Sequence, residues 1–538
     1  MPQTNTGRLT RMKDSVMAGD DVIDLAHVVA LFGVYAGLDL ATRLLANIDD
    51  QQLRRSVLLV SAIASNPLAV IAFVAGLVLV AAGRLDRFTI RWQELDHGHA
   101  LRWLATPLIL LLAWQGGLYK YNFVLDRSHG VDRMLIIALA IGCLARPAFL
   151  VPFALQTRVI AAQFDYPFGT TAAQNIDELL VIALLAIASA HIWFVISGHT
   201  DTAPVLLLLG AAIATHFYIP GRTKMGIDWL ATNDISNLPL SAYTVGWRGQ
   251  GDGSWSRQMA EFARMLGRAG LVATLALELG ALLAVTNYRL LRFWILMCIP
   301  FHVVLFAFTG FWFLSWIVLQ LGLALLLWRP ANRQWAHRNL TPARGAFAFG
   351  VVLLGGSTLF HPPSLAWLDA PVSYGYRIEA TGESGTKYQV PISAFAPLEQ
   401  ELAFYRFQLG DAQPLSGAYG AIVSATEYDR LKSLTSFGEV EGLEQATMTD
   451  QRLRGEDFIR RFVDNANSKG PGWWSSIAAP DHFWTGAKDP TYSFQEPVTS
   501  VEVSVLTALH NDGDPQFKRD IVLSIQVDDT GKAQVCFP

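Results

Sequence analysis

The chain has 538 residues, of which 52% are hydrophobic and only 16% are charged, and its formal net charge at pH 7 is -4. This composition is typical of membrane proteins and argues against a soluble globular protein. The net charge is an average over a membrane part and a soluble part and says little about partners, but the lack of a basic patch or a nucleic-acid module excludes nucleic-acid binding.

Residues 1–22 carry Arg8, Arg11 and Lys13 but no short apolar core that ends in a small-residue cleavage site. We therefore expect a cytoplasmic N-terminal segment without a removable signal peptide. The first membrane helix would then direct insertion.

Apolar runs of about 18 to 25 residues, long enough to cross a bilayer, fill the region 23–366. They predict a polytopic α-helical membrane domain of about 8–10 helices. The predicted spans are Ile23–Leu45, Ser56–Gly83, Leu101–Tyr121, Met134–Leu155, Leu179–Gly198, Pro204–Gly221, Ala269–Tyr288, Leu291–Gly310, Phe311–Trp328 and Gly345–His361.

A polar, glycine-rich insertion, Ala231–Trp255, separates the sixth and seventh spans, and residues 256–270 after it have the pattern of an amphipathic interfacial helix. Basic residues cluster at the N-terminus and again at 329–344, and such clusters stay in the cytoplasm. An even number of crossings must then separate the two clusters. Nine of the predicted spans lie between them, so one segment must be assigned incorrectly. The last span would carry the C-terminal domain outside.

Residues 367–538 have the mixed composition of a soluble domain, which we predict to be extracytoplasmic and α+β or mainly β. The segment "YGYRIEATGESGTKYQVPISAF" alternates like a hairpin, "PLEQELAFYRFQL" looks helical, and "NDGD" and "DDTGK" mark further turns. The aromatic segment around Trp473, Trp474, His482 and Trp484 is a binding surface, part of the domain's own core or its contact with the membrane face.

Ionisable residues within apolar spans are functional candidates, because burying them in hydrocarbon is costly. Each group also has a structural interpretation: a solvated loop for 126–133, packing for His191, snorkelling of Lys224 to the interface, and a structural Glu–His pair for Glu278 and His302. The candidates are Asp126, Arg127, His129, Asp132, Arg133, His191, His216, Lys224, Glu278 and His302.

Lys224 follows an apolar helix in "FYIPGRTKMGIDW". An ammonium group that is removed from water loses solvation energy, and the neutral amine becomes available as a base. Such a lysine can take a proton from a weak acid dissolved in the membrane, such as a quinol. Tyr218, Asp228 and Trp229 are then positioning groups. The three cysteines, Cys143, Cys298 and Cys536, assemble neither a disulfide framework nor a zinc site, and we expect no metal.

Three stretches in this order resemble the vitamin K-dependent γ-glutamyl carboxylases. They are "VLDRSHGVDRMLIIAL", "YIPGRTKMGIDW" and "LELGALLAVTNYRLLRFWILMCIPFHVVLFAFTGFWFLSW". The ordered set is similar to the broader HTTM group, to which the carboxylases belong, over about residues 23–328. No single stretch is specific.

The resemblance implies that the catalytic base of the carboxylases falls on Lys224, their aspartate on Asp126 and their membrane histidine on His302. In that family the lysine deprotonates vitamin K hydroquinone, and oxidation by O2 yields a strong base that removes a glutamate γ-proton before CO2 adds. The chain departs from the family at Arg133, where a histidine is expected, with His129 out of register. The 170 or so residues after the last span are also fewer than the carboxylases carry.

Two functions follow as expectations. The first is a multi-pass enzyme of the cell membrane, in contact with lipid, that uses vitamin K hydroquinone or another quinol to modify a peptide or protein. Its catalytic residues would be Lys224 and His302, and its substrate-binding residues Asp126, His216, Asp228, Trp229 and Glu278. The alternative is a non-catalytic HTTM factor for maturation or export of a secreted peptide or protein. A transporter is less favoured, since no inverted repeat is visible.

Overall fold

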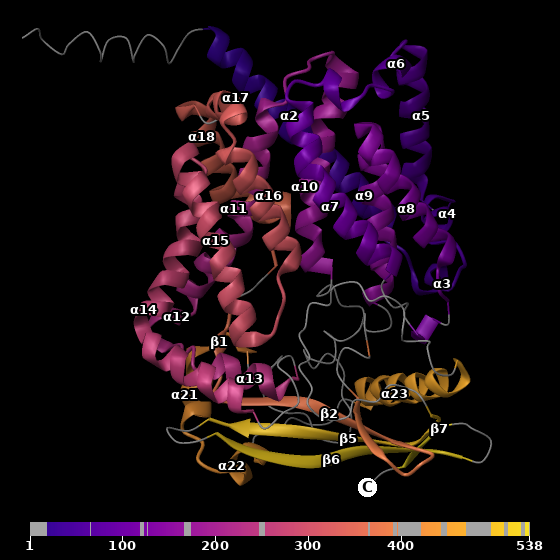
Figure 1. Ribbon diagram of the computed structural model, residues 1–538, viewed down its shortest axis with the longest axis vertical. Helices are drawn as coiled ribbons and strands as arrows, with labels where there is room; N and C mark the ends of the chain where they lie inside the picture. Colours follow the sequence, from indigo (N-terminus) through magenta and orange to yellow (C-terminus); the bar gives the residue numbers. More distant parts are fainter. Residues whose placement is uncertain are drawn as a thin grey trace, which may run out of the picture.

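The computed structural model describes residues 19–538, except 65, 119–122, 126, 166–173, 247–252, 340, 364–365, 391–394, 396–420, 443–448, 470–495, 511–514, 529–532 and 537–538. A bundle of long helices forms one part of the molecule, and an antiparallel sheet lies across one end of it (Figure 1). The predicted fold class, a polytopic helical membrane domain followed by a small domain with a sheet, is confirmed.

Seven helices of the described residues are long and apolar enough to cross a membrane, and nine spans result if two bent helix pairs are counted. This pattern indicates a multi-pass membrane protein. Their ranges are Leu25–Ala46 in α2, Gly98–Leu118 (α7), Glu178–Ser197 in α10, Ala203–Gly226 (α11), Ser254–Ala284 (α14), Tyr288–Thr309 (α15) and Pro342–Phe360 (α18 to α19). The bent pairs are α4 (Leu58–Ala64) with α5 (Pro67–Ala81), and α16 (Leu314–Trp328) with Pro330–His337.

α11 is the central helix of the bundle, because almost all of its side chains are buried by the helices around it. α5 is the opposite case: Val70, Ile71 and Val78 are exposed along it, as expected for a helix that faces lipid. Lys224, the charged residue among the buried side chains of α11, is therefore surrounded by protein rather than by hydrocarbon.

One predicted span, Met134–Leu155, is wrong. The structure divides it into α8 (Gly130–Ala145) and α9 (Leu150–Ala161), which run as a hairpin. Pro147 forces Arg146 into an extended conformation and ends α8. The ring of Phe149 then packs where a side chain at Gly142 would lie.

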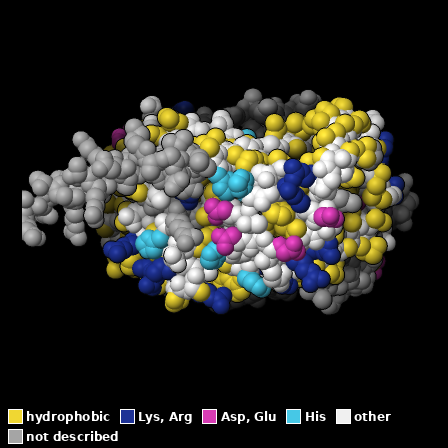
Figure 2. Space-filling view, turned by 90° about the horizontal axis from the view of Figure 1, so that it is seen from above, with side chains coloured by type: hydrophobic (Ala, Val, Ile, Leu, Met, Phe, Trp, Pro, Cys, Tyr) yellow, Lys and Arg dark blue, Asp and Glu magenta, His cyan; other side chains and the backbone are white. Residues whose placement is uncertain are grey.

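This division supplies the crossing that the charge pattern requires. In the part of the chain that the structure describes, ten helical passes precede Arg329 when the shorter α8 and α9 are counted with the longer helices: α2, α4 with α5, α7, α8, α9, α10, α11, α14, α15 and α16. An even number returns the chain to the end where α2 begins. α17 (Arg333–Asn339) lies at that end, away from the sheet (Figure 1). Arg333, its first residue, and Arg329, which follows α16, are exposed. The surface of this end carries basic, acidic and histidine side chains (Figure 2).

The segment after α11 is partly helical, with α12 (Trp229–Thr232) and α13 (Asn237–Thr244). The predicted amphipathic helix, 256–270, forms the first part of α14, and a break at Gly267 separates it from the membrane-spanning part. Gly267 has φ +47° and ψ -136°, a conformation that favours glycine. The chain can therefore turn sharply there without strain.

The sheet has the order β3-β2-β5-β6-β7 and is antiparallel throughout. The predicted hairpin is confirmed as β2 (Val372–Gly382) and β3 (Lys387–Val390). β5 (Val498–Leu509), β6 (Gln516–Val527) and β7 (Ala533–Cys536) follow, and β1 (Leu368–Asp369) pairs with β4 (Ala421–Ile422). The helices α21 (Ala425–Lys432), α22 (Phe437–Glu441) and α23 (Thr449–Lys469) accompany the sheet. The predicted "PLEQELAFYRFQL" helix and the Trp473–Trp484 segment lie outside the described residues.

β2 rests directly on α13, which joins the sheet to the membrane helices. A Cβ atom at Gly375 would overlap the backbone of Thr244 and Val245, so only glycine permits this approach. The Arg377 guanidinium donates a 2.7 Å hydrogen bond to the carbonyl of Thr244, and Ser373 contacts the hydroxyl of Thr244 at 3.0 Å. The sheet is therefore held against the bundle by specific polar contacts.

Candidate functional site

Lys224 lies near the end of α11 and is paired inside the protein. Its side chain is almost fully buried, and its Nζ donates a hydrogen bond to Oε1 of Glu278 on α14. A snorkelling lysine would extend to the exposed surface at the helix end, whereas this side chain is directed to a buried carboxylate. The second carboxylate oxygen of Glu278 is buried and has no hydrogen-bond partner among the described residues.

Gly221 allows the two helices to come close enough for this pair. A Cβ atom there would lie 2.8 Å from Cβ of Glu278 and 3.2 Å from a methyl group of Leu279. The glycine is one turn before Lys224 on the same helix. The site therefore depends on the absence of a side chain at this position.

Gly221→Ala is expected to lower the free energy of unfolding by about 1–3 kcal/mol, the usual cost of overpacking. The better helix propensity of alanine, about 1 kcal/mol, offsets only part of this cost. Gly226→Ala is the matched control, because it changes the same helix where no atom lies within 4 Å of the added Cβ. Thermal unfolding in detergent micelles measures both, and equal midpoints would contradict the close approach.

Trp229 lies beside the lysine, with Nζ of Lys224 5.1 Å from the ring centroid. Such a contact with the ring holds the end of the lysine side chain in place. Asp228, predicted as a binding residue, is exposed and contributes instead through its backbone. It has φ +54°, and its carbonyl accepts the amide hydrogens of Ala231 and Thr232. This turn starts α12 and brings Trp229 back toward Lys224.

The sheet domain meets the site four residues after Trp229. Asn233 donates a 2.9 Å hydrogen bond to the carboxylate of Asp369 and accepts one from its backbone amide. Trp367 donates to the other carboxylate oxygen at 3.0 Å. Burial raises the pKa of Asp369 to about 6, although these hydrogen bonds and the charge of Lys224 oppose the shift.

This shift predicts a pH dependence. A carboxyl group whose pKa is raised by folding contributes most stability below its unfolded pKa, and this contribution is lost as the pH rises through about 6. Between pH 5 and pH 7.5 the wild type should lose about 1 kcal/mol through Asp369. Unfolding midpoints at the two pH values, compared with Asp369→Asn, measure this loss. An equal pH dependence in the variant would contradict the assignment.

His302, on α15, pairs with Gln320 of α16 and not with Glu278, so the predicted structural Glu–His pair is wrong. Its Nδ1 lies 3.1 Å from Oε1 of Gln320. Its ring contacts those of Phe217, Phe313 and Trp316 at centroid distances of 5.6, 5.0 and 5.3 Å. Because Phe217 is two helical turns before Lys224, His302 faces the side of α11 that carries the lysine.

His216 is buried on α11, and its Nδ1 lies 2.8 Å from the carbonyl oxygen of Ala212. The ring packs edge-on against Trp316, at a centroid distance of 5.6 Å. Trp316 therefore contacts both histidines that the sequence singled out on this side of the bundle.

The other residues that the sequence analysis proposed are not part of the Lys224 site. Asp126 lies outside the described residues. Asp132 is not part of a solvated loop: it is buried and accepts hydrogen bonds from the amides of Leu58 and Leu59, which begin α4. His191 is buried in α10 and contacts Phe88. Among the residues described, no three His, Cys, Asp or Glu side chains are grouped so as to hold a metal ion.

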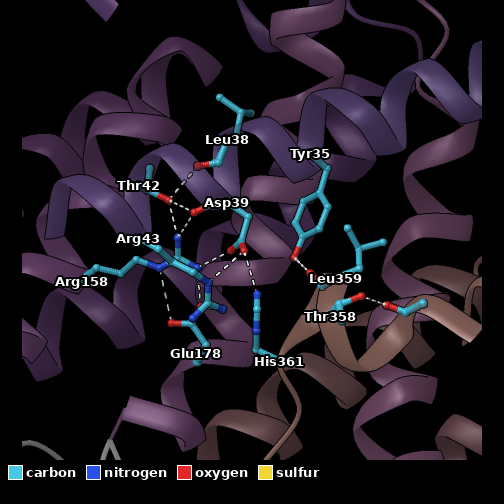
Figure 3. A network of polar contacts seen from close by, with 11 residues as sticks. Tyr35, Leu38, Asp39, Thr42, Arg43, Arg158, Glu178, Thr358, Leu359 and His361 are labelled. Carbon is cyan, nitrogen blue, oxygen red and sulfur yellow. Dashed lines mark hydrogen bonds and ion pairs between the residues drawn. The ribbon is translucent and has the colours of Figure 1, made fainter. Parts of the chain in front are cut away.

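A second cluster of buried charges joins α2, α9 and α10 (Figure 3). Arg158 donates a 2.5 Å hydrogen bond to Asp39 and is paired with Glu178. Arg43 donates to the same two carboxylates, at 2.9 and 2.7 Å, and His361 lies 3.8 Å from Asp39. We call Asp39, Arg43, Arg158 and Glu178 the charge network. The two positive and two negative charges of the network add up to zero. The network is therefore able to hold the three helices together without leaving a buried charge unpaired.

The sequence interpretation missed this network. Asp39 and Arg43 were visible as charges one helical turn apart in the first span. Arg158 lies beyond the end of the incorrectly predicted fourth span, Met134–Leu155, and the sequence analysis gave it no role. The position of Arg158, only three residues after an apolar run, is the signal that could have marked it as a membrane-embedded charge.

Comparison of the chain with protein-family models, with curated proteins and with solved structures found no match. The resemblance to the HTTM group is therefore neither supported nor contradicted by known relatives.

Proposed function

We propose that this protein is a membrane enzyme in which Lys224 acts as a base on a lipid-soluble quinol, driving the modification of a peptide or protein. The main support for this proposal is the buried pair between Lys224, on the central helix α11, and Glu278 on α14. Removing two charges from water is costly. A pair at this depth is therefore a functional candidate, and it has the groups that a proton transfer needs.

In this proposal the proton of the quinol hydroxyl moves to Nζ of Lys224, and Glu278 holds the proton that the lysine gives up. The two groups are in direct hydrogen-bond contact, so the transfer needs no movement of either helix. Trp229 keeps the amine in place. The second oxygen of Glu278, which is buried without a described partner, fits a ligand that offers a hydroxyl group.

A bound quinol would supply, by its oxidation with O2, a base strong enough to remove a carbon-bound proton from the acceptor, as the resemblance to the carboxylases implies. His302 would face this reaction from α15, held by Gln320. The rings of Phe217, Phe301, Phe313 and Trp316 surround the histidine. Such an apolar lining excludes water, which strengthens the electrostatic interactions of the site.

We place the sheet domain outside the cell. The exposed Arg329 and Arg333 lie at the opposite end of the bundle, and arginines near span ends stay in the cytoplasm. A secreted peptide or protein would then meet the sheet domain on its own side of the membrane. The contact of Asn233 with Asp369 connects that domain to the segment that follows Lys224.

The experiment is to incubate purified protein with vitamin K hydroquinone in the presence of O2 and to detect the epoxide by mass spectrometry. Lys224→Ala should lower the rate at least about 100-fold, the lower range for a lost general base. Lys387→Ala is the matched control, because Lys387 forms a 3.1 Å pair with Glu502 on the exposed sheet surface.

Epoxide from the wild type and from Lys387→Ala, but not from folded Lys224→Ala, is the expected result. An unchanged rate in Lys224→Ala would contradict the role of the lysine. No epoxide from the wild type would favour the alternative function, a non-catalytic factor for the maturation or export of a secreted peptide or protein.

A further inference from the structure

Four arginines lie where α15 begins and α16 ends, at the end of the bundle away from the sheet. Arg289 and Arg292 belong to the first turns of α15, Arg329 follows α16, and Arg333 begins α17. We call these four residues the arginine cluster. Within the described part of the chain, none of them forms an ion pair, and the first turn of α15 contains no acidic residue. The cluster is therefore an uncompensated excess of positive charge.

The start of α15 and the end of α16 are in direct contact, which brings these arginines to one place. The hydroxyl of Tyr288 donates a hydrogen bond to the carbonyl of Leu327. The ring of Tyr288 also lies 4.4 Å from that of His337 on α17. The guanidinium carbon of Arg292 lies 4.0 Å from the ring centroid of Trp328. Three helices thus meet at the arginine cluster.

Exposed apolar side chains lead up to this place along both long helices. On α16, Leu321, Leu325 and Trp328 are exposed, and their spacing of four and three residues puts them on one face. On α15, Phe293 and Met297 are exposed one turn apart. The rings of Phe293 and Trp328 meet edge to face at a centroid distance of 6.0 Å. Because these helices are long enough to cross the membrane, both faces would contact lipid chains.

Aromatic rings hold Arg292 in place at the end of these apolar faces. Besides its contact with Trp328, its guanidinium carbon lies 5.6 Å from the ring centroids of Tyr288 and Phe293. Its Nε is buried and has no hydrogen-bond partner among the described residues. A planar guanidinium group that is already fixed by stacking loses little freedom when it binds an oxyanion. Arg292 is therefore prepared for an anionic ligand such as a phosphate group.

The ligand that fits both features has a phosphate group and hydrocarbon chains. Tryptophan and arginine side chains at the ends of membrane spans lie at the level of the lipid headgroups. A phospholipid with a net negative charge fits better than a zwitterionic one, because the arginines would repel a cationic headgroup.

We propose that the arginine cluster binds one anionic phospholipid in the membrane leaflet away from the sheet. The phosphate lies among the guanidinium groups, and the acyl chains lie along the exposed faces of α15 and α16. The site is at the opposite end of the bundle from Lys224, so it does not depend on the proposed enzymatic activity.

The test uses the purified full-length protein in a nonionic detergent. Native mass spectrometry measures the binding of phosphatidylglycerol and of phosphatidylcholine with the same acyl chains. The test variant is Arg289→Gln with Arg329→Gln, which changes two exposed residues of the cluster. The matched control is Arg264→Gln with Arg268→Gln, which removes the same charge from exposed positions on α14. Thermal unfolding confirms that both variants are folded.

The wild type should bind phosphatidylglycerol more tightly than phosphatidylcholine. The test variant should bind phosphatidylglycerol about 30-fold more weakly than the wild type, the effect of two arginines close to an anionic lipid. The control should bind it as tightly as the wild type. Equal affinities of the wild type for the two lipids, an unchanged affinity in the test variant, or the same loss in the control would overturn the proposal. So would displacement of the lipid by an equal concentration of glycerol phosphate, since the ligand would then be a soluble phosphate.

Discussion

Arg158→Leu is expected to destabilise the protein by about 3–5 kcal/mol, the cost of removing one member of a buried ion pair. Arg158 donates hydrogen bonds to Asp39 and is paired with Glu178, and all three side chains are buried. Without it, two carboxylates share the remaining Arg43. Thermal unfolding in detergent micelles measures the loss.

Two further variants test whether the ion pairs of the charge network stabilise the helix bundle. Arg43→Leu should cost less, because 30% of the Arg43 side chain is exposed and water can replace part of the interaction. The double change Arg158→Leu with Glu178→Leu should recover much of the stability, since it leaves no unpaired charge in place of that pair. A double variant less stable than Arg158→Leu alone would contradict this account.

Glu278→Gln is expected to lower the rate of quinol oxidation by a factor of about 100 to 10,000, the range for a group that transfers a proton. Glutamine still accepts a hydrogen bond from Lys224, but it cannot hold the proton that the lysine gives up. Glu261→Gln is the control, since Glu261 lies on the same helix and is exposed. Epoxide formation at matched amounts of folded protein measures both.

A double variant distinguishes a loss of stability from a loss of catalysis at the Lys224–Glu278 pair. The double change Lys224→Met with Glu278→Leu removes both charges, so it should fold better than Glu278→Gln, which leaves the ammonium without its counter-ion. It should nevertheless have no activity. Activity in this double variant would show that the pair is structural only.

The fold followed from the sequence because the apolar runs are long and the C-terminal part alternates in hairpin patterns. The error at Met134–Leu155 has a local cause: Pro147 interrupts a run that is otherwise apolar on both sides. Composition alone does not distinguish one span from a tight helical hairpin. That error also hid Arg158, which then lay outside every predicted span.

The sequence analysis predicted which residues belong to the site, but not which of them contact one another. Lys224 and Glu278 each stood out as a charge beside apolar sequence, yet 54 residues separate them and their meeting depends on the close approach at Gly221. The structural pair predicted for Glu278 and His302 rested on their both being flanked by apolar residues, but His302 pairs with Gln320 instead. Asp228 was assigned a side-chain role, whereas its backbone makes the turn that positions Trp229.

The most direct test of the proposed base is the ionisation of a bound quinol in the absence of O2. Ionising the hydroxyl of a naphthoquinol moves its absorbance to longer wavelength, so the spectrum reports where the proton lies without any need for the peptide acceptor. We expect this shift on binding to the wild type at a pH where the free quinol is neutral, and no shift with folded Lys224→Ala that still binds the ring. An unshifted spectrum of the quinol bound to the wild type, or the same shift with Lys224→Ala, would contradict the claim that Lys224 takes the proton.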